Sequence, residues 1–207
     1  MEQIKIKQSK LRTITCWSAA VLLSIVLTVA AVHGYRSGIL YWFETITRDQ
    51  VYKSGVIPPD KLEKFINRYN IRTIIDLRTP ARDSRLNPGK QDDIDLEHKI
   101  LTELGVRHIN IPSPQVPPDD AVEAFLEVMD DEDSRPVLIH CFHGRGRAVL
   151  FSAIYRIEYE GWDNERARRA TRMITWGSSF SKNTSKGIYL LDYIPRTDTK
   201  KQNKSKL

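Results

Sequence analysis

The residues best suited to chemistry lie in one short run, from Val137 to Ala148. Its apolar beginning, as far as Ile139, predicts a buried strand, and His140 and Cys141 follow it. The next residues include two glycines and two arginines, and an apolar-periodic helix begins after them. Glycines let backbone N–H groups turn inward, the helix start adds its positive dipole end, and an arginine can hold two phosphate oxygens. The run therefore predicts an anion pocket with a cysteine at its base.

Cys141 is suited to act as a nucleophile in this pocket. A thiolate is stabilised at a helix N-terminus beside guanidinium groups. The only other cysteine, Cys16, lies at the edge of an apolar N-terminal run, so we expect neither a disulfide within the soluble part nor a thiol zinc cluster. A lone cysteine is more often a small buried hydrophobe, but the glycines and arginines around this one favour a nucleophile. We expect no metal and no cofactor.

The spacing His-Cys, five residues, Arg resembles the signature of the cysteine-dependent dual-specificity and protein tyrosine phosphatase superfamily. The chain resembles small bacterial membrane-anchored members from about residue 52 to residue 171, including the runs 73–78 and 105–112. The resemblance implies that Cys141 attacks phosphorus to form a phosphocysteine and that Arg147 holds the equatorial oxygens, without a metal. The implied substrate-binding residues are His140, Phe142, His143, Gly144, Arg145 and Gly146.

Two features depart from the family pattern. The arginine is followed by Ala148, where the family nearly always has a serine or threonine whose hydroxyl helps the thiolate leave the phosphoenzyme. The family's general acid lies about thirty residues before the cysteine, where this chain has 110–114 and no carboxylate. The nearest candidates are Asp119 and Asp120, which also fit as helix N-caps, and Asp83 is more distant. A catalytically weak phosphate-binding pseudophosphatase is therefore an alternative.

Strands and helices alternate around this loop, which predicts an α/β domain with a mostly parallel central sheet flanked by helices. The resemblance implies the same dual-specificity phosphatase-like fold. Asp60, with Glu63 three residues on, is expected to cap the first helix of the domain. Other expected elements are strands at 71–77 and 106–111 and helices at 92–104, 148–159 and 163–174.

Several basic side chains could meet a second anionic group. Arg82 and Arg85 lie in a loop that could border the pocket, although a charged loop is usually only solvated. The helix at 163–174 is expected to turn four arginines largely outward, either as a solvated basic face or toward anionic lipid headgroups. They are Arg166, Arg168, Arg169 and Arg172. His143 and Arg145 make the signature loop more cationic than that of a typical tyrosine phosphatase, and relatives that act on lipids or inositol phosphates often carry a basic residue at the position of Arg145. Together with the membrane anchor expected at the N-terminus, this resemblance suggests a phospholipid headgroup or an inositol phosphate as the substrate, and a phosphotyrosine protein is the alternative.

An uncharged apolar run near the N-terminus predicts one transmembrane helix over residues 13–35. Basic residues precede it, and Tyr35, Tyr41, Trp42 and Phe43 follow it as an interfacial belt. The basic flank should stay cytoplasmic, so the helix would anchor the chain in the cell membrane with its catalytic domain extracytoplasmic. A cleaved signal peptide is the competing interpretation.

The expected domain organisation has five parts. They are a basic flank (1–12), the transmembrane helix (13–35), a juxtamembrane linker (36–50), the catalytic domain (51–195) and a basic disordered tail (196–207). The net charge of +6 comes from the ends, because residues 1–34 carry +3 and the tail +4. That distribution removes the main support for nucleic-acid binding. A rhodanese-like sulfurtransferase is less well supported, because its loop typically leaves four residues between Cys and Arg.

Overall fold

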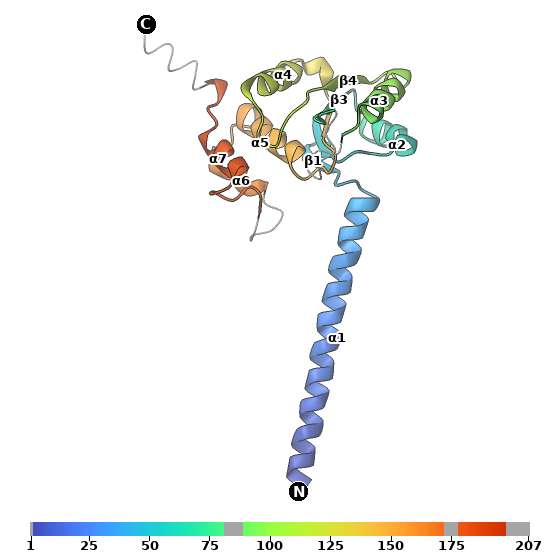
Figure 1. Ribbon diagram of the computed structural model, residues 1–207, viewed down its shortest axis with the longest axis vertical. Coiled ribbons are helices and arrows are strands. Elements are labelled where there is room, and N and C mark those ends of the chain that lie inside the picture. The colour runs from blue at the N-terminus through green and yellow to red at the C-terminus, as the bar shows by residue number, and fades with distance from the viewer. Residues whose placement is uncertain (1, 81–88, 172–177, 198–207) are drawn as a thin grey trace. The chain divides into compact units, whose positions relative to one another are not determined.

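A computed structural model describes residues 2–80, 89–171 and 178–197 of the chain (Figure 1). It divides the chain into two compact units, Met1–Leu40 and Tyr41–Leu207. The first unit is helical, and the second contains a sheet with helices on both faces. The predictions that fall outside the described residues concern Arg82, Asp83, Arg85, Arg172 and residues 198–207.

The first unit is built on helix α1 (Glu2–Gly38). Its stretch Trp17–Gly38 has 22 residues and a mean hydropathy of 1.8, and none of its residues is buried within the protein. By length and composition it can cross the hydrocarbon core of a bilayer. The expected N-terminal apolar helix is therefore present, although the same length and composition also occur in signal sequences.

The second unit contains a five-stranded sheet in the order β1-β2-β5-β3-β4. The strands are β1 (Glu44–Thr47), β2 (Val51–Ser54), β3 (Thr73–Asp76), β4 (Arg107–Asn110) and β5 (Val137–His140). The last four are parallel, and β1 pairs antiparallel with β2 at one edge. This confirms the predicted α/β fold. The inner strands β2, β5 and β3 are buried along their whole length, as expected of parallel strands covered on both faces.

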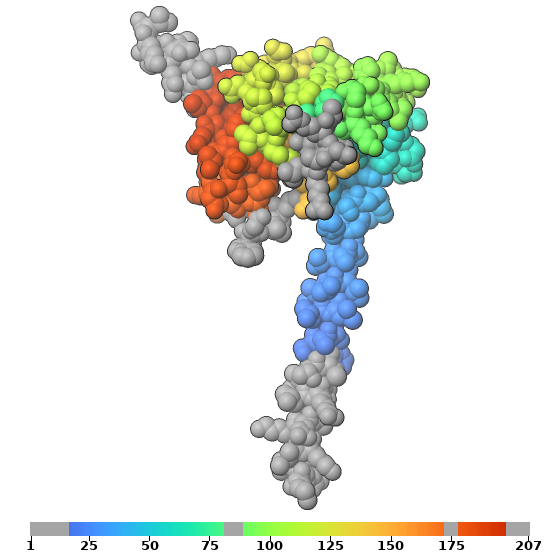
Figure 2. All heavy atoms as spheres, viewed as in Figure 1, coloured from blue at the N-terminus to red at the C-terminus, as the bar shows by residue number. Residues whose placement is uncertain are grey.

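Two groups of helices cover the sheet. The helices are α2 (Pro59–Tyr69), α3 (Gln91–Glu103), α4 (Asp119–Asp130), the short 3₁₀ helix η1 (Glu132–Ser134), α5 (Arg147–Tyr159), α6 (Asn164–Ala170) and α7 (Ser185–Asp192). Ile74 and Leu138 pack into a core with α2 and α3, whereas their neighbours Ile75 and Ile139 pack into a larger core with α4, α5, α6 and α7. Successive strand residues point to opposite faces, so each strand serves both cores. Figure 2 shows residues 178–197, in red, lying against α4, in yellow-green.

The predicted cap of α2 is wrong. The helix begins at Pro59, and its N-cap is Pro58, which makes no side-chain cap hydrogen bond. Asp60 instead lies within the first turn and pairs with Lys61 at 2.9 Å on the surface. Proline suits a first helical turn because its φ is already helical and its missing N–H would have no partner there.

The segment 36–50, which we expected to be a linker, contains β1. Phe43 stacks on Tyr69 with 4.3 Å between ring centroids, and Tyr41 packs against Phe65 at 6.0 Å. These aromatic side chains, which we had assigned to an interfacial belt, therefore contact α2 of the same unit. The compact unit accordingly begins at Tyr41.

Arg168 does not point outward as expected, because it is 1% exposed. Its Nη1 donates to the Phe180 carbonyl oxygen at 2.7 Å, and its Nε and Nη2 donate to the Glu165 carboxylate at 2.8 and 2.9 Å. A buried guanidinium requires such partners, since an unpaired charge would be costly. The contact joins α6 to the segment that precedes α7.

The loop between β5 and α5 is sensitive to the replacement of Gly144 by alanine. Gly144 has a φ of +66°, and a Cβ there would lie 2.3 Å from the Gly55 nitrogen. Gly161 has the same φ but no atom within 4 Å of its Cβ position, so Gly161→Ala is a matched control that should cost about 1 kcal/mol. Gly144→Ala should cost clearly more, because backbone must move. Denaturant unfolding of the full chain in detergent measures both, and equal losses would contradict this packing.

Candidate active site

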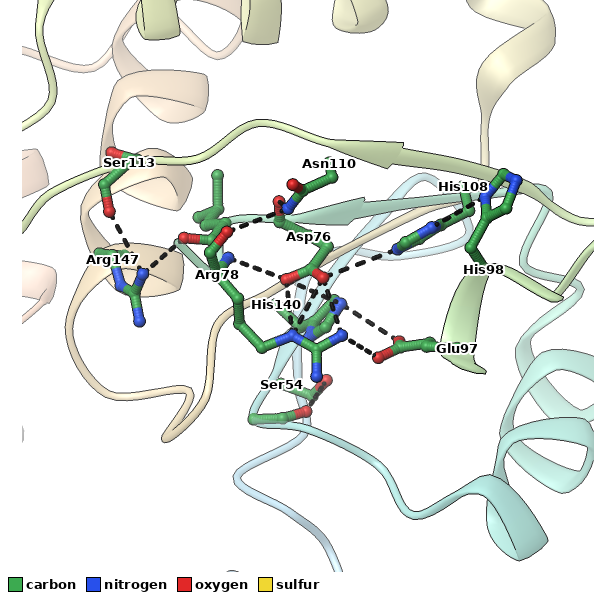
Figure 3. Close-up of polar contacts among 12 residues, drawn as sticks. Ser54, Asp76, Arg78, Glu97, His98, His108, Asn110, Ser113, His140 and Arg147 are labelled. Atoms are coloured by element: carbon green, nitrogen blue, oxygen red, sulfur yellow. Dashed lines mark hydrogen bonds and ion pairs between the residues drawn. The ribbon is translucent and has the colours of Figure 1, made fainter. Parts of the chain in front are cut away.

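The carboxyl ends of the four parallel strands lie in one row. Ser54 pairs with His140, His140 with Asp76, and Asp76 with Asn110. Figure 3 shows these four polar residues along the same edge of the sheet. Ligands of open parallel sheets bind beyond this edge, so the row marks the floor of a candidate site. Cys141 follows it directly.

The loop after β5 is held by β2 and by Val56, which lies two residues beyond the end of β2. Cys141 is 3% exposed, and α5 begins six residues later with Gly146 as its N-cap. The Val56 N–H donates to the Phe142 carbonyl oxygen at 3.1 Å, and Lys53 Nζ donates to the Gly144 carbonyl oxygen at 3.4 Å. These carbonyls therefore turn toward β2. The start of α5, with its positive dipole end, lies at the other end of the loop.

Arg147 is buried, and one of its N–H donors has no hydrogen-bond partner among the described residues. Its side chain is 2% exposed, and its Nη1 donates to the carbonyl oxygens of Leu77 at 2.6 Å and Ser113 at 3.2 Å (Figure 3). Its Nε is buried without a hydrogen-bond partner among the described residues. Burial lowers the pKa of Arg147, and the charge of a Cys141 thiolate opposes that change. An arginine remains protonated in proteins, so the unused N–H favours an anion beside Cys141.

A buried ion-pair network lies behind the loop. Arg78 is 2% exposed, donates to both carboxylate oxygens of Asp76 at 2.8 to 3.0 Å, and also donates to Glu97 (Figure 3). The other oxygen of Glu97 lies 3.3 Å from His140 Nε2, at ion-pair distance but without hydrogen-bond alignment. The network thus joins β3 and α3 to the histidine that precedes Cys141.

Asp76 remains ionised in this network. Burial alone would raise its pKa, but the charge of His140 and the contacts of His108 and Arg78 outweigh burial and hold the pKa well below its usual range. Asp76, His108 and His140 also bring possible metal-ligand atoms within 4.8 Å of one another. The Asp76 carboxylate already accepts three bonds from the Arg78 guanidinium, whose charge would repel a cation. The geometry therefore favours a structural hydrogen-bond network over a metal site.

The remaining predicted substrate-binding residues line the outer part of the loop. Phe142 is 37% exposed and lies edge-on to His143 with 4.8 Å between ring centroids. Burial first, then the charges of Arg145 and Arg147, lower the pKa of His143, so its ring is neutral at neutral pH. The Arg145 guanidinium lies 4.7 Å from the centroid of the Trp42 ring. This cation–π contact holds the exposed Arg145 guanidinium beside the loop and leaves its N–H groups able to form hydrogen bonds.

Asp119 and Asp120 are not N-caps, contrary to our expectation. They are the first two residues of α4, and its N-cap is Pro118, which makes no side-chain cap hydrogen bond. Asp120 Oδ1 instead accepts from the Ala121 N–H at 2.8 Å. Both carboxylates are exposed in the first turn, where the helix dipole stabilises negative charge.

Sequence reasoning missed Glu97, although a signal was present. Ile94 and Leu101, three residues before it and four after it, are both buried on the inward face of α3. A carboxylate between two such positions is expected to be buried and therefore to require a cationic partner. Arg78 follows a predicted buried strand and carries no comparable signal, so the pair could not be recognised from either residue alone.

The match to a known family covers most of the chain. The family is described as "DSP-PTPase phosphatase fused to NAD+ Kinase", and its model matches residues 43–186. Among curated proteins, the dual specificity protein phosphatase TpbA of Pseudomonas aeruginosa is 38% identical over 69 residues. That alignment spans about a third of each chain, 32% of this one and 32% of the relative.

Solved structures share the fold at low sequence identity. The core catalytic domain of the PP-IP phosphatase Siw14 from S. cerevisiae is similar with a TM-score of 0.57 and 17% identity, over 79% of this chain and 91% of that one. The TpbA crystal structure gives a TM-score of 0.52 and 21% identity, over 70% and 81% of the two chains.

Glu97→Gln tests the buried network. The amide keeps the shape but not the charge, so Arg78 loses one of its two anionic partners and the free energy of unfolding should fall by about 2 kcal/mol. Lys61→Gln is the control, because it breaks an exposed pair with Asp60 and should change nothing measurable. Urea unfolding of both variants measures the difference. If the two variants unfold alike, the network does not stabilise the fold.

Proposed function

Because the chain belongs to the family described as "DSP-PTPase phosphatase fused to NAD+ Kinase", we propose that it hydrolyses phosphomonoesters through a phosphocysteine at Cys141. The cysteine-dependent dual-specificity and tyrosine phosphatase superfamily includes this family. The observation that carries the proposal is the buried Nε of Arg147, which lacks a partner among the described residues, in a helix that begins beside Cys141. Such a donor is stabilised by an anion's oxygen.

The proposed reaction has two displacements at phosphorus. The Cys141 thiolate forms the S–P bond as the P–O bond to the leaving group breaks, and the leaving oxygen takes a proton. Water then attacks phosphorus, the S–P bond breaks, and phosphate and the thiolate are released. Arg147 and the N–H groups of residues 142–147 would hold the equatorial oxygens, where charge accumulates in the transition state. These steps use no metal.

The residue that protonates the leaving oxygen is a separate proposal. Asp119 and Asp120 are our candidates because they are the acids nearest to the 110–114 segment, and both are solvent-exposed at the start of α4. An exposed carboxylate can exchange its proton with water between turnovers.

Ala148 favours a second candidate function, a phosphate-binding pseudophosphatase. It is completely buried as the second residue of α5 and has no hydroxyl to assist departure of the thiolate. The nearby hydroxyl of Ser152 already donates to the Ala148 carbonyl oxygen at 2.7 Å. Binding would then be retained while the second displacement is slow. The sulfurtransferase alternative is less well supported, because the family that matches the chain is described as a phosphatase family.

The outer loop supports substrates with more than one anionic group. Arg145 is exposed and held over Trp42, so its guanidinium can meet a second phosphate at the mouth of the pocket. The yeast structure with the same fold is titled a PP-IP phosphatase. We propose an inositol phosphate or a phospholipid headgroup as the substrate, with a phosphotyrosine protein as the alternative.

We also propose that α1 anchors the chain in a membrane. The apolar stretch Trp17–Gly38 has the length to span a bilayer. Basic residues precede it, and the positive-inside rule then places residues 51–195 outside the cytoplasm. Residues 1–12 would be cytoplasmic.

Hydrolysis of para-nitrophenyl phosphate by the full chain in detergent tests the activity. The wild type should turn over in the presence of EDTA, and Cys141→Ser should be inactive because serine is a far weaker nucleophile at neutral pH. Arg147→Lys should lower kcat/KM by about 10²- to 10³-fold, because a lysine cannot reproduce the planar fork. Arg107→Lys, at an exposed arginine, should match the wild type.

Other outcomes of this assay identify the alternatives. Phosphate binding without turnover would favour the pseudophosphatase, and thiosulfate-dependent thiocyanate formation would favour the sulfurtransferase. Turnover that survives in Cys141→Ser would refute a phosphocysteine at that residue. A panel of phospholipids, inositol phosphates and phosphotyrosine peptides then ranks the substrates.

The topology is tested by an alkaline phosphatase reporter fused after Leu207. It should be active, because this reporter folds only where disulfides form, outside the cytoplasm. The matched control carries the reporter before Met1 and should be inactive. A tag at the N-terminus that is retained in the membrane fraction would show that α1 is uncleaved. Reversed reporter activities would overturn the orientation.

A further inference from the structure

A lysine from α7 reaches the loop that contains Cys141. Lys186 Nζ donates to the Gln115 Oε1 at 3.0 Å, and both atoms lie next to Gly146. A Cβ on Gly146 would be 3.0 Å from the amide oxygen and 3.3 Å from the ammonium. The ammonium therefore borders the residue that precedes Arg147, at a point where the loop has no side chain.

The chain around Lys186 is built to hold this position. Gly187 packs so closely that a Cβ there would lie 1.8 Å from the Ser181 carbonyl oxygen. The Thr184 hydroxyl caps α7 by accepting from the Gly187 N–H and donates to the Ser181 carbonyl oxygen at 2.8 Å. The Phe180 ring lies 5.0 Å from Lys186 Nζ. The Lys186 side chain therefore extends from the rigidly packed first turn of α7, and its ammonium lies near the Phe180 ring, which stabilises a cation.

The charged groups near Lys186 are those of the proposed anion pocket. Burial lowers its pKa, a Cys141 thiolate opposes that effect, and Arg147 adds to it. A lysine that interacts with both of these groups lies at the same anion pocket. A phosphomonoester brings a charge of about −2 to a pocket that already contains a thiolate. Arg147 and the helix dipole together supply a charge of only about +1.5, which is less than the combined negative charge of the phosphate and the thiolate.

We propose that Lys186 is a further ligand of the substrate's phosphate, held in place by Gln115. The proposal rests on the proposed function and adds a cation from outside the signature loop. An ammonium has three N–H donors, of which Gln115 accepts one, so the others are available to phosphate oxygens. Lys186 binds the phosphate dianion itself, whereas Arg145 is placed for a second group.

The test measures phosphate binding without requiring turnover. Inorganic phosphate should protect Cys141 of the full chain in detergent from alkylation by iodoacetamide, and the concentration for half protection gives its dissociation constant. Lys186→Met should raise this constant about tenfold, the effect of losing one charge-assisted hydrogen bond. Lys186→Arg should stay within about threefold of the wild type. The control, Lys182→Met, removes an exposed lysine of the same segment and should change nothing.

The outcomes separate this proposal from the proposed function. If the wild type does not hydrolyse para-nitrophenyl phosphate but Lys186→Met still weakens protection, the ligand role holds and the hydrolase is wrong. If the wild type hydrolyses and a folded Lys186→Met is protected like the wild type, the ligand role is overturned. It is also overturned if Lys186→Arg loses as much protection as Lys186→Met. In the hydrolysis assay the methionine variant should raise KM more than it lowers kcat.

Discussion

The carboxyl edge of the sheet depends on one buried cation, the guanidinium of Arg78. A charge this deeply buried would cost several kcal/mol without partners, so the fold requires Asp76 and Glu97 where they are. Both carboxylates then lie beside His140, and the chain continues from Asp76 to Leu77, whose carbonyl accepts from Arg147. The position of Arg147 is therefore set partly by residues behind the loop.

The residues proposed to bind phosphate are more completely fixed in the structure than those proposed to complete turnover. Arg147, the N-terminus of α5 and the polar edge of the sheet converge on Cys141, and each is fixed by contacts of its own. The groups that would complete the chemistry are less evident, since Ala148 has no hydroxyl and the candidate acids are exposed. In the proposed reaction, phosphate binding and thiolate release therefore depend on different residues.

The features that sequence patterns predicted are local ones. The strand, loop and helix around Cys141 are contiguous, so their order alone indicated the anion pocket, and the alternation of strands and helices indicated the sheet. The partners of that loop were not predictable in the same way. Lys53, Glu97 and Lys186 come from β2, α3 and α7, and only the strand order and the helix packing bring them to one edge. Arg168 was misjudged because its burial depends on a distant carbonyl, that of Phe180.

The close packing of Gly144 on Gly55 limits which other protein scaffolds could accommodate the signature loop. Each glycine lies where a Cβ would meet the other's backbone, at 2.3 Å in one direction and 3.3 Å in the other. The signature loop is thus shaped against the end of β2 as well as by its own sequence. Grafting the loop onto another strand-and-helix scaffold would require a neighbouring parallel strand that is followed directly by glycine at the same level. During evolution the two positions are expected to change together, or not at all.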